Sequence, residues 1–255
     1  MTLVVLATVA VAVVSGLRGA WSPCGLSMLS TITPIGERGR GNRYATTARW
    51  YVAGAAVGGL CLGAVGAVLA LVSGAHGDAQ LVVLVLASLL AAASDARVGG
   101  FALPTHRRQV NERWLDQYRP WVYGGGFGWQ IGTGLATYIT TAAVYLLVVV
   151  VAVGGDPMLA LVGGLLFGVT RGLAVLLTRH VRTTDDLRRV HVAVQHAGPA
   201  LHDAVLAVEV AVAIAAADSM ARPLGVAALL AGGAVLTYAR RHRTLVCDLD
   251  ADRRL

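Results

Sequence analysis

The first apolar stretch of the chain, residues 3–36, reads LVVLATVAVAVVSGLRGAWSPCGLSMLSTITPIG. It is longer than the ~20 residues that one straight membrane span needs, and Ser22-Pro23-Cys24 interrupts it near its middle. Proline lacks the backbone N–H and clashes with the preceding turn, and Ser22, Pro23 and Cys24 suit the N-cap, N1 and N2 positions of a new helix. We therefore expect a broken transmembrane helix with a cysteine in the first turn of its second part.

The rest of the chain is equally apolar. Hydrophobic residues make up 56% of the sequence and charged residues 14%, whereas soluble domains are roughly a quarter charged. Further stretches of span length lie at residues 50–74, 81–96, 123–153, 158–178, 201–217 and 224–238. The sequence thus predicts an all-α, polytopic membrane protein with seven spans, forming a single transmembrane domain over residues 1–255.

Arginines lie mainly in every second gap between the apolar stretches. The basic gaps contain Arg38, Arg40, Arg43 and Arg49, then Arg97, Arg107, Arg108, Arg113 and Arg119, then Arg179, Arg182, Arg188 and Arg189, and finally the residues after the last span. Because loops rich in arginine stay in the cytoplasm, we expect a multi-pass protein of the cell membrane with its N-terminus outside and its C-terminus inside. The net charge of +7 then reflects contact with the lipid bilayer and its anionic headgroups, and no binding of nucleic acid is expected.

The two halves of the chain can be aligned with each other. Cys24-Gly25-Leu26 falls on Thr133-Gly134-Leu135, and residues 57–60 (VGGL) fall on residues 162–165 (VGGL). Three spans reverse their orientation on a second appearance, so the pattern predicts a 3+3 inverted repeat with a seventh C-terminal helix. The expected parts are a first repeat (1–100), a cytoplasmic loop (101–122), a second repeat (123–217), an extra span (223–239) and a cytoplasmic tail (240–255).

The fourth apolar stretch has its own break. Gly132-Thr133-Gly134 can interrupt the helix through backbone freedom, and Thr133 offers a hydroxyl where the first half offers the Cys24 thiol. Paired broken helices of an inverted repeat meet near the bilayer midplane. The predicted site therefore lies at Cys24 and Thr133, and Arg18, a turn or two before Cys24, would favour a thiolate there or reach into a polar cavity.

The chain resembles the CcdA/DsbD family of transmembrane thiol carriers, which pass reducing equivalents from cytoplasmic thioredoxin to thioredoxin-like proteins outside. The resemblance covers roughly residues 1–217. It rests on Trp21-Ser22-Pro23-Cys24 and on Gly99-Gly100-Phe101-Ala102-Leu103-Pro104 before a second glycine-rich broken span. It implies an electron carrier related to those of cytochrome c biogenesis, with a thioredoxin-like donor in the cytoplasm and a thioredoxin-like acceptor outside.

The resemblance makes Cys24 the redox cysteine of the first half. The second cysteine of the family falls on Thr133, and the proline before it falls on Gly132. Threonine cannot form the disulfide that the family opens and closes, so the carrier is either degenerate or uses another thiol. Cys61 is the only other cysteine within a predicted span; it would be the resolving thiol, unless a partner supplies one or Cys61 only packs among small residues.

Two charged residues interrupt later spans, Arg171 in the fifth and Glu209 in the sixth. Charges at such depth usually face the bundle interior or a water-filled path, so Arg171 and Glu209 would pair or line a route for solute or protons. This supports an alternative function, a secondary transporter or exporter of a small solute with its site at the paired broken helices. A structural or assembly subunit of a larger membrane complex is a third possibility.

No enzyme of the hydrolase or transferase type is indicated, and no cofactor is expected. His191, His196 and His202 are spaced by five and six residues, which does not place them on one helical face as metal ligands, so no metal site is expected. Residues 187–195 follow Thr183-Thr184-Asp185-Asp186 and are expected to form a capped helix on the cytoplasmic surface.

Overall fold

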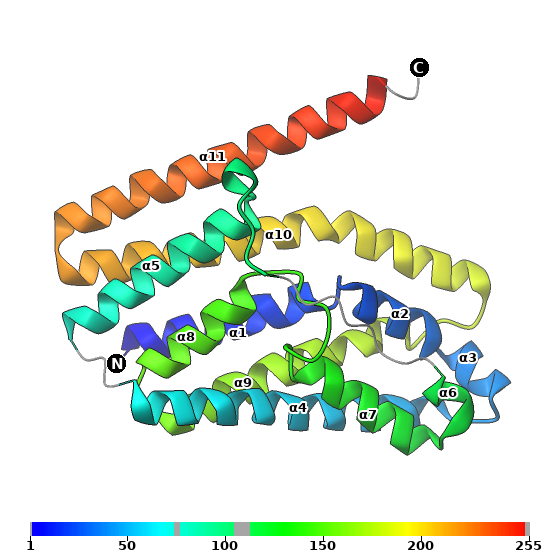
Figure 1. Cartoon of the computed structure of the whole chain (residues 1–255). Coiled ribbons are helices and arrows are strands. Elements are labelled where there is room, and N and C mark those ends of the chain that lie inside the picture. The colour runs from blue at the N-terminus through cyan, green and yellow to red at the C-terminus, as the bar shows by residue number, and fades with distance from the viewer. Residues whose placement is uncertain (1, 74–76, 105–112, 253–255) are drawn as a thin grey trace.

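The computed structural model describes residues 2–73, 77–104 and 113–252, and within these ranges all regular structure is helical (Figure 1). The predicted all-α class is confirmed. The first half contains α1 (Thr2–Gly19), α2 (Pro23–Thr31), α3 (Pro34–Gly39), α4 (Tyr44–Val72), α5 (Asp78–Asp95) and the 3-10 turn η1 (Val98–Gly100). The second half contains α6 (Trp114–Gln117), α7 (Pro120–Gly132), α8 (Ala143–Val153), α9 (Pro157–Leu173), the 3-10 turn η2 (Ala174–Thr178), α10 (Thr184–Met220) and α11 (Arg222–Asp252).

Five helical segments of the described chain are long and apolar enough to cross a membrane. They are Thr2–Gly19, Tyr44–Val72, Asp78–Asp95, Pro157–Thr178 and Thr184–Met220. The predicted fourth span is divided between α7 and the shorter apolar helix α8, and the predicted seventh lies within α11. Both predicted helix breaks, at Ser22-Pro23-Cys24 and at Gly132-Thr133-Gly134, are present.

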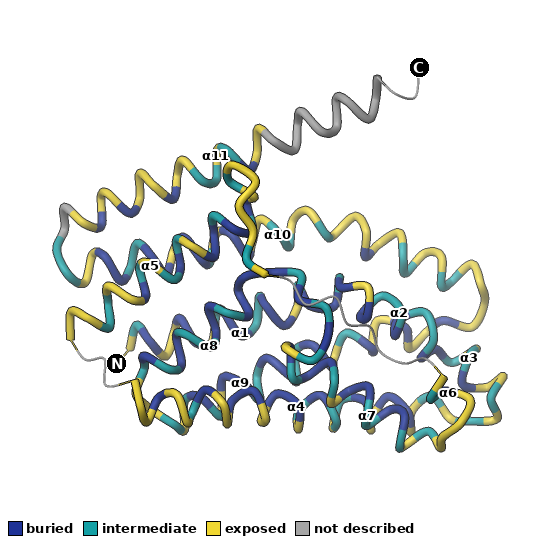
Figure 2. Tube along the Cα trace, viewed as in Figure 1, coloured by how far each residue is buried: buried dark blue, intermediate teal, exposed yellow. Residues whose placement is uncertain are grey.

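The centre of the bundle is formed by α4 where it packs against α9 and α7. A methyl group at Gly58 would overlap the carbonyl oxygen of Trp129 in α7, and one at Gly132 would overlap that of Ala55 in α4. Glycines thus let these backbones touch, which is how helices gain contact in lipid, where burial of apolar surface provides little drive. Buried residues concentrate where α1, α4, α8 and α9 meet (Figure 2).

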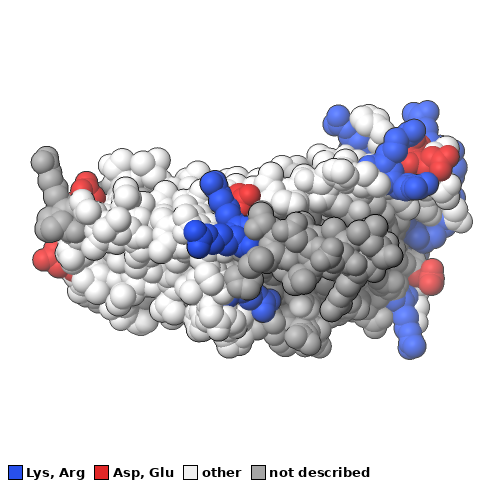
Figure 3. Space-filling model, turned by 90° about the horizontal axis from the view of Figure 1, so that it is seen from above, with Lys and Arg blue, Asp and Glu red and all other residues white. Residues whose placement is uncertain are grey.

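The outward faces of the helices are apolar as well. On α4, Val57, Val65, Val68 and Leu71 are all more than half exposed. Large continuous apolar surfaces of this kind mark contact with a membrane or a partner. Basic side chains gather instead at the end of the bundle formed by α3, α6 and the start of α10, with a second group near the middle of the molecule (Figure 3).

One expectation about the second half was wrong in detail. The capped segment 187–195 is not a separate surface helix, because α10 runs without interruption from Thr184 to Met220 and includes Pro199. Its cap is as expected, since Thr183 and Asp186 form a reciprocal capping box. The predicted tail 240–255 is helical as far as Asp252, and residues 105–112 of the predicted loop, with Arg107 and Arg108, lie outside the described residues.

Candidate functional site at the two helix breaks

The first break is made by residues 20–22. The Ser22 hydroxyl accepts a hydrogen bond from the Gly25 N–H at 3.1 Å, Pro23 occupies the first helical position, and Cys24 follows it. Gly25 is required here, because any side chain at this position would overlap the Ala20 carbonyl. The chain therefore turns tightly at the end of α1 and places Cys24 in the first turn of α2, as the sequence predicted.

The second break is longer than a kink. Helix α7 ends at Gly132, and residues 133–142 form no regular structure before α8 begins at Ala143. Gly134 has a φ of +68°, a conformation that glycine adopts without strain. The Thr133 hydroxyl donates to the Gln130 carbonyl at 2.8 Å, so this hydroxyl is engaged with its own helix end.

Arg171 of α9 joins the two breaks. Its guanidinium donates to the Ile131 carbonyl at the end of α7 at 2.9 Å, and more distantly, at 3.4 Å, to Ser22 Oγ, Thr137 Oγ1 and the Gly19 carbonyl. The residue is only 2% exposed. A side chain at Gly19 would collide with the guanidinium, with 2.5 Å between its Cβ and Arg171 Nε. Carbonyls at helix ends carry partial negative charge, so the broken ends stabilise this cation, which has no acidic partner among the described residues.

Cys24 lies in a closed apolar cluster, within electrostatic range of this cation. It is 2% exposed, shares the cluster with Met28, Tyr51 and Phe127, and lies close enough to Arg171 for their charges to interact. Arg18 is placed elsewhere. It lines a separate cavity, where its charge acts on Asp95. This agrees with the second of the two expectations for Arg18, a polar cavity, while Arg171 is the cation near the thiol.

Cys61 is placed apart from Cys24. No disulfide joins the two, and Cys24 is buried near Tyr51 whereas Cys61 is exposed on α4. Tyr51 and Cys61 are ten residues apart on α4, which is about 15 Å along the helix axis. The structure therefore does not bring the two thiols next to each other.

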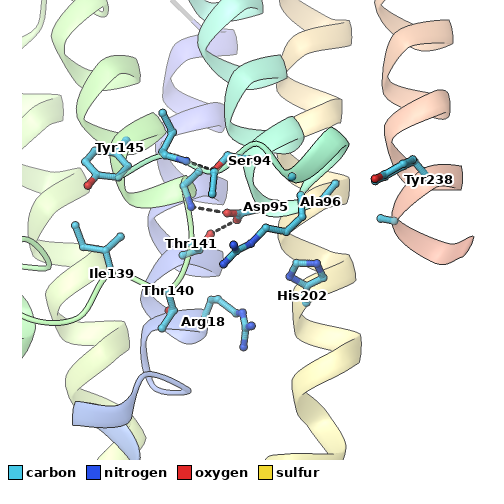
Figure 4. A pocket seen from close by; sticks show the side chains of 16 residues that line it. Arg18, Ser94, Asp95, Ala96, Ile139, Thr140, Thr141, Tyr145, His202 and Tyr238 are labelled. Atoms are coloured by element: carbon cyan, nitrogen blue, oxygen red, sulfur yellow. Dashed lines mark hydrogen bonds between the residues drawn. The ribbon is translucent and has the colours of Figure 1, made fainter. Parts of the chain in front are cut away.

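A cavity of about 640 Å³ lies beside the second break (Figure 4). Its polar lining includes Arg18, Asp95, Arg97, Thr140, His202 and Tyr238. The Asp95 carboxylate accepts hydrogen bonds from the Thr141 hydroxyl and, at 2.7 Å, from the Ala142 N–H at the start of α8. Asp95 thereby fixes the far end of the second break to the end of α5.

Glu209 does not pair with Arg171. It is fully buried on α10, and neither carboxyl oxygen has a hydrogen-bond partner among the described residues. The charged group that acts on it is Asp95. The midplane pair that the sequence suggested is thus replaced by two separate arrangements: Arg171 with the helix ends, and Glu209 with Asp95.

A second buried carboxylate escaped the sequence analysis. Glu37 of α3 is fully buried and accepts hydrogen bonds from Arg40 at 2.7 Å, Thr47 at 2.5 Å and Tyr123 at 2.6 Å. Burial alone would lower the pKa of Arg40, but the hydrogen bond and charge of Glu37 outweigh it and raise that pKa. Glu37 thereby ties α3 to α4 and α7. The local signal was Glu37 three residues before Arg40, which is common on helix surfaces.

The sequence is similar to curated proteins named methylamine utilization protein MauF. That of Methylorubrum extorquens is 30% identical over 202 residues, which cover 76% of this chain and 70% of the relative. Those of Paracoccus denitrificans and Paracoccus versutus are 31% and 30% identical over 172 and 165 residues, and the matches span about 60% of the length of these relatives. No family model matches the chain, and no solved structure matches it significantly. Together with its apolar helices, this similarity shows a multi-pass integral membrane protein.

Proposed function

Because the chain belongs to the family of the methylamine utilization protein MauF, we propose that it is a membrane relay for thiol–disulfide exchange that serves methylamine utilization, with Cys24 as its reactive thiol. The resemblance of its Trp21–Cys24 segment to the CcdA/DsbD thiol carriers supports this function. The proposed partners are a thioredoxin-like donor in the cytoplasm and a thioredoxin-like acceptor outside.

The observation that carries the proposal is the position of Cys24. It lies in the first turn of α2, at the positive end of the helix dipole, and close enough to the buried guanidinium of Arg171 for their charges to interact. A thiolate formed there during exchange is favoured by this positive helix end and by the charge of Arg171. The same guanidinium holds the ends of both breaks, so movement of either break alters the surroundings of the sulfur.

The exchange requires one protein thiol and two partners. The Cys24 thiolate attacks the acceptor disulfide; an S–S bond forms between Cys24 and one acceptor sulfur, and the other acceptor sulfur leaves as a thiolate. A donor thiolate then attacks the Cys24 sulfur and releases the acceptor as a dithiol, and the second donor thiol displaces Cys24 as the donor forms its own disulfide. The donor loses two electrons and two protons, the acceptor gains both, and Cys24 returns to its starting state. Neither Thr133 nor Cys61 is needed.

The donor must reach the Cys24 sulfur while the acceptor is still attached to it, so both breaks have to move during the exchange. An inverted repeat would relate the two movements. Three reciprocal contacts between α4 and α9 support the repeat. Gly59 and Gly164 each face the carbonyl of the other, while Gly168 faces the Ala55 carbonyl and Gly63 faces the Ala160 carbonyl. Ala55, Gly59 and Gly63 have the same spacing as Ala160, Gly164 and Gly168, as a two-fold axis between the helices demands.

The proposed orientation places the N-terminus outside and the C-terminus in the cytoplasm. The basic end of the bundle, formed by α3, α6 and the start of α10, would then face the cytoplasm (Figure 3). In this orientation α2 lies on the cytoplasmic side of the first break, and the donor reaches Cys24 from the end that carries the arginines.

Trapping of a mixed disulfide tests the function. The full-length protein in membranes is incubated with a thioredoxin that lacks its resolving cysteine and whose remaining cysteine carries thionitrobenzoate in a mixed disulfide. Attack by the Cys24 thiolate forms an S–S bond with the thioredoxin and releases thionitrobenzoate, and adducts are separated on non-reducing gels. We expect an adduct with the wild type and with Cys61→Ser, and none with Cys24→Ser. An adduct that persists in Cys24→Ser, or full growth on methylamine of a strain that carries only Cys24→Ser, would overturn the proposal.

A secondary transporter of a small solute is the second candidate, and the cavity of about 640 Å³ near Asp95 favours it. If the protein is a transporter, the Cys24 thiol is dispensable, whereas the buried residues Arg171 and Glu209 are required. Loss of function in Arg171→Ala and Glu209→Ala together with normal function of Cys24→Ser would select the transporter.

A further inference from the structure

Glu209 occupies an unusual position for a carboxyl group. It lies in the part of α10 that crosses the bundle, is fully buried, and has no hydrogen-bond partner among the described residues. His202, two turns earlier on the same face of α10, lines the cavity beside the second break (Figure 4). Glu209 thus lies deeper in the protein than a residue that reaches the cavity.

Asp95 connects Glu209 to that cavity. Its carboxylate lines the cavity and is close enough to Glu209 for the two charges to interact. The negative charges of the two acids are stabilised to different extents by their neighbours. Asp95 accepts hydrogen bonds from Thr141 and the Ala142 N–H, and its charge is opposed by Arg18 and Arg97, whereas Glu209 has neither hydrogen bonds nor an ion pair among the residues described.

This difference in surroundings indicates which of the two carboxyl groups holds a proton more tightly. An ionised carboxylate without partners is very costly in an apolar interior, and a second negative charge nearby raises the cost further. Of the two acids, Glu209 therefore favours the protonated form more strongly than Asp95 does. Membrane-embedded acids in such an arrangement mark proton pathways in other membrane proteins.

We propose that Glu209 and Asp95 form a proton-binding site that exchanges its proton with water in the neighbouring cavity. On release, the O–H bond of Glu209 breaks as one forms on Asp95, and Asp95 then passes the proton to water. The other titratable or charged groups that face the site through the cavity are Arg18 from α1, Arg97 at the start of η1, Tyr145 from α8, His202 from α10 and Tyr238 from α11.

Proton occupancy is linked to the second break. Asp95 holds Thr141 and the Ala142 N–H through its carboxylate oxygens, and a protonated carboxyl is a weaker acceptor than a carboxylate. While the proton resides on Asp95, the start of α8 is held less firmly. This mechanism involves no cysteine, so failure of the thiol relay would leave it intact.

Infrared spectroscopy of the full-length protein in lipid nanodiscs tests the site. A protonated carboxyl gives a C=O stretching band that a carboxylate lacks. We expect such a band at neutral pH in the wild type, its loss in Glu209→Gln, and its retention in Glu37→Gln. Glu37 is the matched control because it is equally buried but paired with Arg40. Exposed Asp116→Asn is a second control that leaves the interior untouched. A spectrum without the band, or a band that survives in Glu209→Gln, overturns the proposal.

Transfer into D2O tests the exchange. The band should shift within minutes, because the cavity brings water to Asp95, and Asp95→Asn should slow the shift about tenfold or more, which corresponds to a barrier higher by about 1.4 kcal/mol. A band that does not shift over hours, or that shifts at the same rate in folded Asp95→Asn, contradicts proton exchange through Asp95. If Asp95→Asn does not fold, the proposal is judged from two other measurements: the loss of the C=O band in Glu209→Gln, and the shift of this band in the wild type on transfer into D2O.

Discussion

Gly59 of α4 and Gly164 of α9 face each other backbone to backbone, so that a methyl group on either would overlap the carbonyl oxygen of the other. Each helix therefore approaches its neighbour as closely as two main chains can. The contact lies at the centre of the bundle, between the segments that carry the two breaks. Its tolerance to substitution is correspondingly low.

Alanine at this contact should destabilise the protein. Gly59→Ala and Gly164→Ala each insert a methyl group against rigid backbone, and overpacking of this kind costs about 1–3 kcal/mol. The measurement is thermal unfolding in detergent. Gly233→Ala is the matched control, since Gly233 is also helical but has nothing within 4 Å of the added methyl group. Equal unfolding temperatures for Gly164→Ala and Gly233→Ala would refute the close contact.

Replacement of Arg171 should loosen both breaks. Arg171→Met keeps the length of the side chain but leaves the buried Ile131 carbonyl and the Thr137 hydroxyl without this donor, and an unsatisfied buried polar group costs about 1–3 kcal/mol. We expect lower stability and faster proteolysis of residues 133–142. Arg188→Met, at an exposed arginine of α10, should leave both unchanged; the same loss in the two variants would assign the effect to charge rather than to the helix ends.

Ser22→Ala should expose Cys24. It removes the N-cap of α2, which is worth about 1 kcal/mol, and the first turn of α2 should then open more often. The rate at which a maleimide labels Cys24, measured in a Cys61→Ser, Cys247→Ser background, should rise about fivefold, the factor that 1 kcal/mol gives. Ser219→Ala, at an exposed serine away from any break, serves as the control. Unchanged labelling in Ser22→Ala would mean that the cap does not keep the thiol closed.

Tyr123→Phe should weaken the contact between α3 and α7. The variant deletes the hydroxyl that donates to Glu37 at 2.6 Å, and a hydrogen bond to a charged group contributes about 1.5–3 kcal/mol. Chemical unfolding in detergent measures the loss. Tyr118→Phe, half exposed near the start of α7, should change stability little. If the two variants behave alike, Glu37 is held by Arg40 and Thr47 alone.

The local breaks of this fold are readable in the sequence because their causes are local. Proline at position 23 with serine before it, and glycines at 132 and 134, act within one or two turns, and the structure has breaks at both places. The continuity of α10 through Pro199 could not be anticipated, because proline usually ends or kinks a helix and only packing against neighbouring helices determines whether the helix continues.

The partners of the buried charges were less accessible from the sequence. Arg171 and Glu209 lie at similar expected depths, which suggested a pair, but the choice between Ile131 and Glu209 as the partner of Arg171 depends on how residues 133–142 fold. Asp95 lies at the end of a predicted span, and no local pattern marks it, because its role arises from Thr141 and Ala142, which are distant in sequence. Contacts of this kind follow from tertiary structure and not from spacing.

Helix α10 has 37 residues, about 55 Å at 1.5 Å per residue, while the hydrocarbon core of a bilayer is about 30 Å thick. Its first turns therefore form an overhang beyond the lipid, and α2 is fastened to that overhang. Trp21 Nε1 donates to the Val194 carbonyl at 2.7 Å, and Ser30 Oγ lies 3.1 Å from the His191 ring. A partner protein bound to the overhang would lie against the segment to which α2 is joined, so its effect on the helix of Cys24 would not have to pass through the bilayer.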